Sequence, residues 1–291
     1  GLCGVRENQD GTLYALNYGK TISAALDPIE KKPLYHFLPH TTIYSFATVG
    51  CNLRCSWCQN WEISQASKPQ KPMIGDIMSP EEHVEWAQRY GCPSIAYTYS
   101  EPTIFLEYAL DTMKIAKEQG LKNVWVTNGY MSGAALELIL PYLDAANVDL
   151  KCSDDDISMK YTGGKLMPVI DNIRTMLEHK VHVEITTLVI PGVNDTQEQL
   201  QTIVDLIVKN FGVDVPWHIS RFFPAWKMKT TAITPLRTLE IARDLGLKAG
   251  IKTIHLCKQL IKCLLTFFIS TAVLWITASA YGIDLIDEYD T

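Results

Sequence analysis

The sequence of 291 residues lacks the features that mark several large classes of protein. It has no internal repeat and no low-complexity run, and with 47% hydrophobic residues it can bury a large core, so wholesale disorder is excluded. It also lacks an excess of positive charge: 26 Lys and Arg stand against 32 Asp and Glu, a formal net charge of −6. No nucleic-acid partner is expected, because such a partner requires a basic face. No secretory signal peptide is visible, and we expect a cytoplasmic protein.

Charge is absent from one long run near the end of the chain. Residues 263–283 carry no charged side chain, and 21 such residues are enough for a helix that crosses ~30 Å of hydrocarbon. Lys252, Lys258 and Lys262 precede the run and acids follow it, as expected for a cytoplasmic body. Three interpretations stay open: a shifted reading frame, a membrane anchor and a soluble core helix. A membrane is expected as a partner only in the second case.

The eight cysteines do not have the even spacing of a disulfide framework. Three of them, Cys51, Cys55 and Cys58, fall within eight residues in the spacing C-x3-C-x2-C. In a long chain this pattern indicates metal binding in a reducing compartment. A structural zinc site normally has four ligands in paired C-x2-C motifs, whereas three thiolates suit an iron–sulfur cluster that keeps one iron open. A passive zinc or electron-transfer module is the alternative.

Strand-like and helix-like segments alternate through most of the chain, which implies a parallel sheet with right-handed crossovers. Strands are predicted at 42–49, 94–99, 123–127, 146–150, 182–190 and 215–222, after short candidates at 14–16 and 22–26. Helices are predicted from Ser79 and over 104–119, 166–177, 200–211 and 236–247. Six units are fewer than the eight of a closed barrel, so the pattern alone allows a partial barrel or a doubly wound sheet.

The cysteine motif, with Trp57 before its third cysteine, resembles the signature of radical S-adenosylmethionine (SAM) enzymes. The stretch CNLRCSWCQNWEISQ, residues 51–65, resembles the pyruvate formate-lyase-activating-enzyme-like branch. More narrowly, DPIEKKPLYHFLP (27–39) and YTYSEPTIFLEY (97–108) are similar to the radical SAM member of the AmmeMemoRadiSam system. The resemblance covers about residues 1–255 of the chain.

The resemblance implies an α/β fold of the radical SAM type, a partial (β/α)6 TIM-like barrel with a short N-terminal extension. The expected parts are a truncated extension at 1–40, the core barrel at 41–256 and an atypical apolar tail at 257–291. The same resemblance implies a radical SAM oxidoreductase. Its [4Fe-4S] cluster would lie on Cys51, Cys55 and Cys58, with SAM at the open iron.

In that chemistry the reduced cluster cleaves SAM to methionine and a 5′-deoxyadenosyl radical, which abstracts hydrogen from a protein or small-molecule substrate. Flavodoxin or ferredoxin is the expected reductant. A glycyl radical enzyme, or an AMMECR1-like or Memo-like protein, is the expected protein partner. The activating-enzyme function and the AmmeMemoRadiSam function are both compatible with the sequence.

Polar residues at the ends of the first four strands are candidate cofactor contacts. By resemblance, Trp57 lies against the adenine and Glu101 holds the SAM ammonium. Ser100 stands where relatives have a glycine before that glutamate. Asp149 and Lys151 lie beside SAM, and Asp149 can also help to bind a monovalent cation. The structural alternatives are a loop acid for Glu101 and a salt bridge for the last pair.

Four further residues complete the candidate set. Thr127 and Asn128 could bond the SAM carboxylate or ribose, although a Thr-Asn-Gly turn chosen for its backbone geometry explains them equally well. Thr186 is expected on the same face of its strand as Glu184, with Thr187 on the other face. Such polar residues in an apolar run indicate an interior lining or, equally, a structural network. His218 could contact substrate or nucleoside, although a lone histidine is more often structural.

Overall fold

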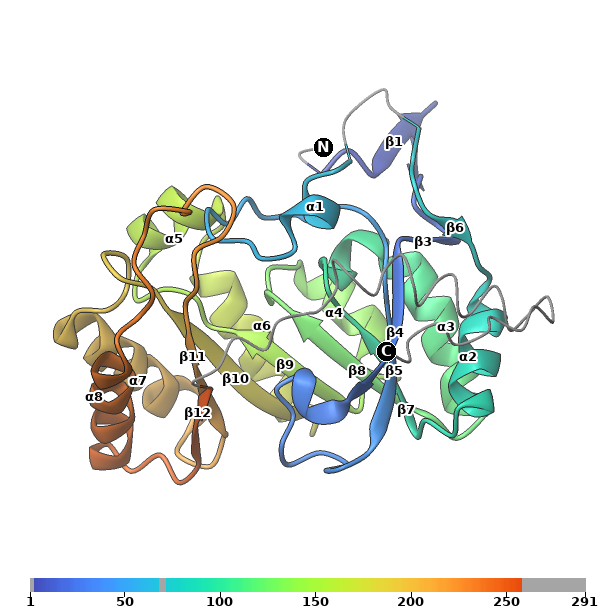
Figure 1. The fold of residues 1–291 in the computed structure, drawn as a ribbon. Coiled ribbons are helices and arrows are strands. Elements are labelled where there is room, and N and C mark those ends of the chain that lie inside the picture. The colour runs from blue at the N-terminus through green and yellow to red at the C-terminus, as the bar shows by residue number, and fades with distance from the viewer. Residues whose placement is uncertain (1–2, 68–71, 258–291) are drawn as a thin grey trace, which may run out of the picture.

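The computed structural model describes residues 3–67 and 72–257, and an eight-stranded sheet in the order β12-β11-β10-β9-β8-β7-β5-β4 forms its centre (Figure 1). The strands are β4 (Ser23–Pro28), β5 (Thr42–Ala47), β7 (Ser94–Tyr97), β8 (Lys122–Thr127), β9 (Ala145–Asp149), β10 (His182–Val189), β11 (Trp217–Arg221) and β12 (Ile254–Cys257). Neighbouring strands from β5 to β12 are parallel, and β4 pairs with β5 in the antiparallel sense. The predicted α/β fold with a parallel sheet is confirmed.

All six predicted strands of the parallel sheet are present, and the sheet extends further at both edges. At one edge the sequence prediction missed β12, because four residues are too few to show a period. At the other edge β4 lies within the segment expected as an N-terminal extension. Among the described residues β12 and β4 do not pair with each other, so the barrel is open.

Short strands lie outside the main sheet. They are β1 (Arg6–Gln9), which pairs with β2 (Thr12–Ala15), and β3 (Lys20–Thr21), which pairs with β6 (Asp76–Ile77). In Figure 1, β1 projects above the sheet at the upper right, and the short helix α1 (Trp61–Ser64) lies at the top of the sheet.

Helices follow the strands as crossovers. They are η2 (Pro102–Phe105), α2 (Pro80–Arg89), α3 (Leu106–Glu118), α4 (Gly133–Ile139), α5 (Asp155–Thr162), α6 (Met167–Glu178), α7 (Gln197–Phe211) and α8 (Leu236–Lys248). The predicted start at Ser79 is confirmed by a capping box, in which the Ser79 hydroxyl accepts from the Glu82 N–H and the Glu82 carboxylate accepts from the Ser79 N–H.

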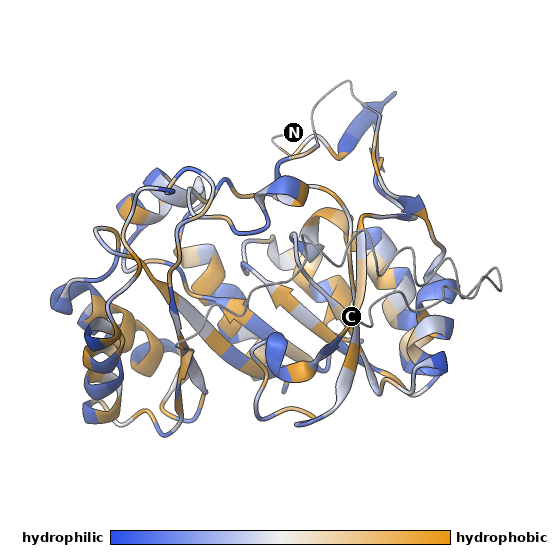
Figure 2. Ribbon diagram, viewed as in Figure 1, coloured by the Kyte–Doolittle hydropathy of each residue, from blue (hydrophilic) through white to orange (hydrophobic). Residues whose placement is uncertain are grey.

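The sheet buries apolar side chains on both faces. On the outer face, Phe46 and Trp125 are fully buried among the helices, and Figure 2 shows hydrophobic strands at the centre with hydrophilic residues along the outside of α8. On the inner face, Ile29 and Leu34 pack against Ile43 and Ala96. These inner residues come from η1 (Ile29–Lys31) and the chain after it; we call residues 29–40 the N-terminal plug.

The plug and the cysteine motif lie at opposite ends of the sheet. In Figure 1, η1 is the blue helical turn at the lower edge of the sheet, and the chain after β5 leads to α1 at the upper edge. Residues 48–58, after β5, carry the three motif cysteines. The carboxyl ends of parallel strands are where such folds place their sites.

No helix in the described part of the chain is long and apolar enough to cross a bilayer. The uncharged run at 263–283, on which the anchor interpretation depends, lies outside the described residues, as does the rest of the expected tail after Cys257.

Candidate functional site

The three motif cysteines occupy one loop, and each is partly buried. The Cys51 sulfur accepts from the Leu53 N–H at 3.4 Å and from the Asn128 side-chain amide at 3.9 Å. Such N–H donors stabilise negative charge on sulfur. The two donors therefore suit Cys51 to be a thiolate ligand.

The cysteine loop is also fixed through its backbone. The Arg54 N–H donates to the Thr162 carbonyl at 2.7 Å, and the Ser56 N–H donates to the Tyr161 carbonyl at 3.0 Å. The Lys227 N–H donates to the Ser56 carbonyl at 3.1 Å. The end of α5 and the chain after β11 therefore hold the loop on its outer side.

Burial raises the pKa of all three thiols, to about 11 for Cys55. For Cys51 the negative charge of Glu101 adds to the effect, whereas Lys151 opposes it at Cys55. The thiols are therefore protonated until a metal displaces the protons.

The motif supplies three thiols as candidate ligands of a metal group. Within residues 3–67 and 72–257, no three His, Cys, Asp or Glu side chains are arranged to hold one metal ion. A four-iron cluster takes each thiolate on a different iron, so its ligands stand further apart than those of a single ion. Cys55 and Cys58 both add to the raised pKa of Cys51, so the three thiols lie within electrostatic reach of one another. Three thiols on one loop fit the ligand set of such a cluster.

Glu101 is buried directly after β7, with 1% of its surface exposed. Its Oε1 atom accepts from the Thr103 N–H at 3.1 Å and from the hydroxyls of Thr103 and Thr127, both at 2.7 Å. Its Oε2 atom accepts from the Asn128 N–H at 2.8 Å. All four donors are neutral, and burial raises the pKa of Glu101 despite them. The Glu101 carboxylate thus contacts two predicted site residues, Thr127 and Asn128, and its Oε2 atom can accept a further hydrogen bond.

Asn128 links this carboxylate to the cysteine loop. Its amide donates to Asn52 Oδ1 at 2.8 Å, and the Asn52 amide donates to the Tyr130 carbonyl at 2.6 Å. Sequence reasoning missed Asn52, although its place inside the cysteine motif is a usable signal. The backbone geometry explains why residue 129 is a glycine: its φ is +70°, and a Cβ there would lie 2.8 Å from Val148 Cγ1.

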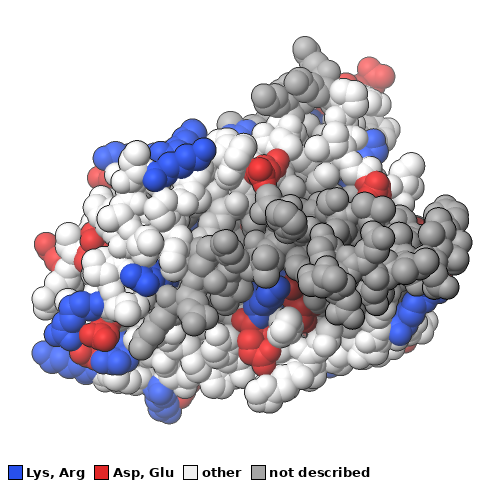
Figure 3. Space-filling model, in the orientation of Figure 1, with Lys and Arg blue, Asp and Glu red and all other residues white. Residues whose placement is uncertain are grey.

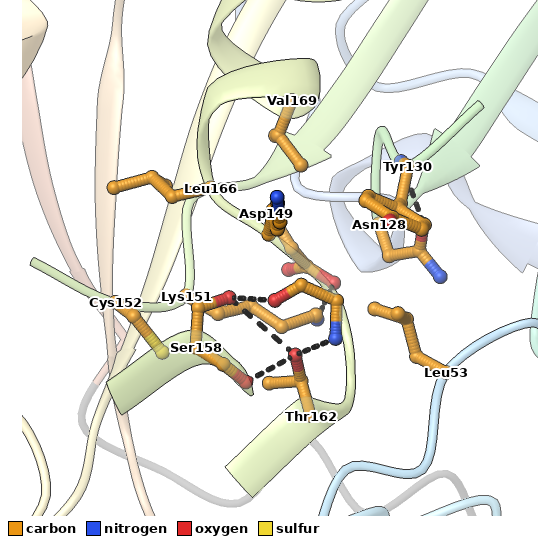
Figure 4. A pocket seen from close by; sticks show the side chains of 12 residues that line it. Leu53, Asn128, Tyr130, Asp149, Lys151, Cys152, Ser158, Thr162, Leu166 and Val169 are labelled. Carbon is orange, nitrogen blue, oxygen red and sulfur yellow. Dashed lines mark hydrogen bonds and ion pairs between the residues drawn. The ribbon is translucent and has the colours of Figure 1, made fainter. Parts of the chain in front are cut away.

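A pocket opens beside this network and encloses about 280 Å³ of space, part of it open to solvent (Figure 4). Asn128, Asp149 and Lys151 line it together with Leu53 of the cysteine loop. Lys151 Nζ lies 2.5 Å from Asp149 Oδ2. Burial lowers the pKa of Lys151, but the charge of Asp149 outweighs it and holds that pKa above its ordinary value. The predicted Asp-Leu-Lys pair is thus an ion pair at the pocket wall.

Trp57 has 4% of its surface exposed and packs in a small apolar cluster with Cys152, Ile190 and Phe222. Its ring centroid lies 6.1 Å from that of Tyr161. The ring therefore supports the cysteine loop from within the protein. Its contact with adenine stays a prediction.

The other predicted residues lie in separate networks. The Ser100 hydroxyl donates to the Thr48 carbonyl at 2.7 Å. The Thr186 hydroxyl donates to Asn147 Oδ1 at 3.0 Å, on the inner face. The predicted alternation along β10 is confirmed, because the Thr187 hydroxyl accepts from the Trp217 indole on the other face.

His218 lies in the amino-terminal part of β11 and is fully buried. Its Nε2 lies 2.6 Å from Glu184 Oε2, and Glu184 also accepts from His182 and from the N–H groups of Tyr35 and His36. Burial would raise the pKa of Glu184, but these donors hold it well below the ordinary value. The structure therefore places His218 in a network that fastens the plug.

Comparisons with known proteins agree with this geometry. The family model of the radical SAM superfamily matches residues 46–207, more than half of the chain. An uncharacterized protein of Methanocaldococcus jannaschii is 44% identical over 256 residues, covering 88% of this chain and 75% of the relative. The pyruvate formate-lyase-activating enzyme of Clostridium pasteurianum is 26% identical over 182 residues, covering 58% of this chain and 72% of the relative.

Among solved structures, a radical SAM methyltransferase from Sphaerobacter thermophilus has a similar fold, with a TM-score of 0.59 at 15% identity over 76% of this chain and 67% of that one. An open α/β barrel with three cysteines at the carboxyl end of its first parallel strand defines a class of cluster-dependent proteins. The chain belongs to the radical SAM superfamily. Membership implies a [4Fe-4S] cluster and SAM as cofactors, and the relatives of this chain include activating enzymes.

Proposed function

We propose that the protein is an enzyme that cleaves SAM reductively and uses the resulting radical to abstract hydrogen from a substrate, as activating enzymes do. The observation that carries the proposal is the environment of Glu101. In the part of the chain that the structure describes, the hydrogen-bond donors to this buried carboxylate are all neutral, and Asn128 connects it to the cysteine loop. A buried charge without a countercharge is costly, and an incoming ammonium group removes that cost.

Each part of the site has a proposed role. Cys51, Cys55 and Cys58 hold the [4Fe-4S] cluster, which when bound and reduced supplies the electron that cleaves SAM to methionine and a 5′-deoxyadenosyl radical. Glu101 accepts the SAM ammonium at Oε2. Asn128 keeps the cysteine loop in register with Glu101.

The pocket wall and three surrounding residues supply further proposed contacts. Asp149 and Lys151 face the bound cofactor, and a monovalent cation could lie on Asp149. Trp57 gives the adenine an apolar surface. The hydroxyls of Ser100 and Thr127 orient the backbone beside it.

The electron donor is proposed to be an acidic protein such as flavodoxin or ferredoxin. Figure 3 shows Lys and Arg side chains gathered at the upper left, where α5 lies in Figure 1. Lys160 of α5 and Lys227 are exposed, and the Lys227 N–H donates to the cysteine loop. Complementary charge would steer an acidic donor to this side of the loop.

The proposed substrate is a protein, by analogy with the relatives that are named activating enzymes. A glycyl radical enzyme is the proposed partner. An AMMECR1-like or Memo-like partner is the alternative that the motifs at 27–39 and 97–108 favour. Incubation with each candidate protein, followed by radical spectroscopy, distinguishes the two.

The direct test is anaerobic reconstitution with iron and sulfide, followed by dithionite and SAM. We expect 5′-deoxyadenosine and methionine in equal amounts. A protein with an intact four-iron spectrum that never cleaves SAM would contradict the proposal. Zinc without iron or labile sulfide would favour the non-catalytic metal-binding module instead.

A matched pair of variants assigns the cluster to the motif. Cys55→Ala is expected to lose the four-iron spectrum and SAM cleavage. Cys92→Ala is the control, because Cys92 is 2% exposed and packs in the outer core far along the chain from the motif. It should keep both properties, and equal losses in the two variants would show a folding defect.

A further inference from the structure

Tyr99 has a backbone conformation that side chains rarely adopt. It lies between β7 and Glu101, and its φ is +62°. The left-handed region costs a residue with a Cβ about 1 kcal/mol or more, and such strain persists only where the surroundings fix it. Specific contacts must therefore hold Tyr99 in this conformation.

Two contacts anchor Tyr99 to separate parts of the molecule. Its carbonyl accepts from the Asn60 amide at 2.7 Å, and Asn60 directly follows the cysteine loop. Its hydroxyl donates to Asp27 Oδ2 at 2.6 Å, on β4. Tyr99 thus joins two segments of the chain, because Asp27 and Asn60 lie more than thirty positions apart in the sequence.

Asp27 is in turn the anchor of the plug. It accepts from Lys31 at 2.9 Å and from Lys32 at 2.7 Å, and Lys32 Nζ lies 4.3 Å from the centroid of the Tyr99 ring. Burial raises the pKa of Asp27, but Lys32 and the other donors outweigh it and lower that pKa to about 2. Tyr99 therefore donates to a charged acceptor, the stronger kind of hydrogen bond.

We propose that Tyr99 is a positioning residue that fixes the N-terminal plug relative to the cysteine loop and the turn that carries Glu101. Its hydroxyl holds the plug through Asp27, and its backbone holds the loop through Asn60. The consequence for SAM binding rests on the proposed function. The mechanical coupling between the plug and the cysteine loop does not depend on the proposed function.

The test compares Tyr99→Phe with Tyr97→Phe. The Tyr97 hydroxyl also makes a buried hydrogen bond, to Asn123 Oδ1 at 2.9 Å, but on the outer face. Each variant is measured by hydrogen exchange of the metal-free protein and by the KM and kcat of SAM cleavage in the reconstituted enzyme. We expect Tyr99→Phe to accelerate exchange in residues 29–40 and to raise the KM for SAM about tenfold, with kcat within about twofold of wild type.

Tyr97→Phe is expected to change neither the exchange of the plug nor the KM, even if it lowers the melting temperature. Tyr99→Gly relieves the backbone strain and removes the ring, so it should raise the KM further without a matching loss of stability. Unchanged exchange in Tyr99→Phe, or the same change in Tyr97→Phe, would overturn the inference. A wild-type enzyme that cleaves no SAM would refute the proposed function, and the exchange comparison would still decide the role of Tyr99.

Discussion

Two buried glutamates at opposite ends of the sheet have opposite electrostatic surroundings. Among residues 3–67 and 72–257, the donors to Glu101, at the carboxyl end of β7, are all neutral, and burial raises its pKa. Glu184, in the amino-terminal half of β10, is as deeply buried, but two histidines and two backbone N–H groups donate to it and lower its pKa. Donors within the protein therefore compensate the desolvation of Glu184 but not that of Glu101.

The difference separates a structural network at Glu184 from the binding site that we propose at Glu101. Glu184 joins the plug to β10 and β11, and its four donors already occupy both oxygens. Glu101 has a lone pair to spare at Oε2 and stands beside the cysteine loop. Burial alone therefore does not distinguish the two glutamates, whereas the distribution of hydrogen-bond donors over the two carboxylate oxygens does.

The largest expected effect is that of Glu184→Gln on stability. A carboxamide cannot accept at both ends, so at least one buried donor among His218, Tyr35 and His36 loses its acceptor. We expect unfolding to become easier by about 3–5 kcal/mol, as for other broken buried pairs, measured by urea denaturation. His182→Gln, which alters a partly exposed donor, should cost less. Equal costs would contradict this order, because the loss of one partly exposed donor would then destabilise the protein as much as the loss of the shared acceptor.

Glu101→Gln should act mainly on SAM. Loss of the negative charge removes one charge-assisted bond, so the KM for SAM should rise about tenfold to 100-fold. Its effect on unfolding is expected to be smaller than that of Glu184→Gln. The cluster spectrum of the variant serves as the control and should be unchanged. An unaltered KM would leave Glu101 as a structural cap of η2.

The pH dependence of stability should have opposite signs at the two glutamates in the metal-free protein. Because the folded pKa of Glu184 is below its unfolded value near ~4.3, its contribution is full above that pH and is lost as the pH falls further. Because the pKa of Glu101 is raised, its contribution is present at low pH and is lost as the pH rises through the folded value. Denaturation of wild type and both variants from pH 3 to 7 measures this. If stability changed with pH in the same direction for both glutamates, the predicted difference in sign would be wrong.

The smallest expected effect belongs to a helix cap outside both networks. Ser79→Ala removes the capping box of α2 and should cost about 1 kcal/mol of stability, measured by thermal unfolding. SAM cleavage should not change. A loss of activity would mean that the outer helices affect the site more than their contacts indicate.

Much of the fold could be predicted because its signals are local. The six strands and the five helices follow from short apolar runs and from the 3.6-residue period, and the capping box is contained in four adjacent residues. β12 was missed, since a four-residue strand next to polar side chains has no measurable period.

The candidate site was predictable only in part. The cysteine spacing is a local pattern, and the residues after each strand follow from the parallel topology. The role of Glu184 depends on donors from the plug, nearly 150 positions away in the sequence, and the role of Tyr99 depends on Asp27 and Asn60. No periodicity relates such distant residues.

The sequence by itself determined the alternating α/β order, the three thiols in one loop and the polar residues at the strand ends. Only the tertiary structure decided that the N-terminal segment folds under the sheet as a plug, that Trp57 is enclosed, and that His218 serves Glu184. The physical reason is the distance along the sequence over which each signal acts. Backbone period and motif spacing are set within a few residues, whereas the charge around a buried group is set by whichever distant segments pack against it.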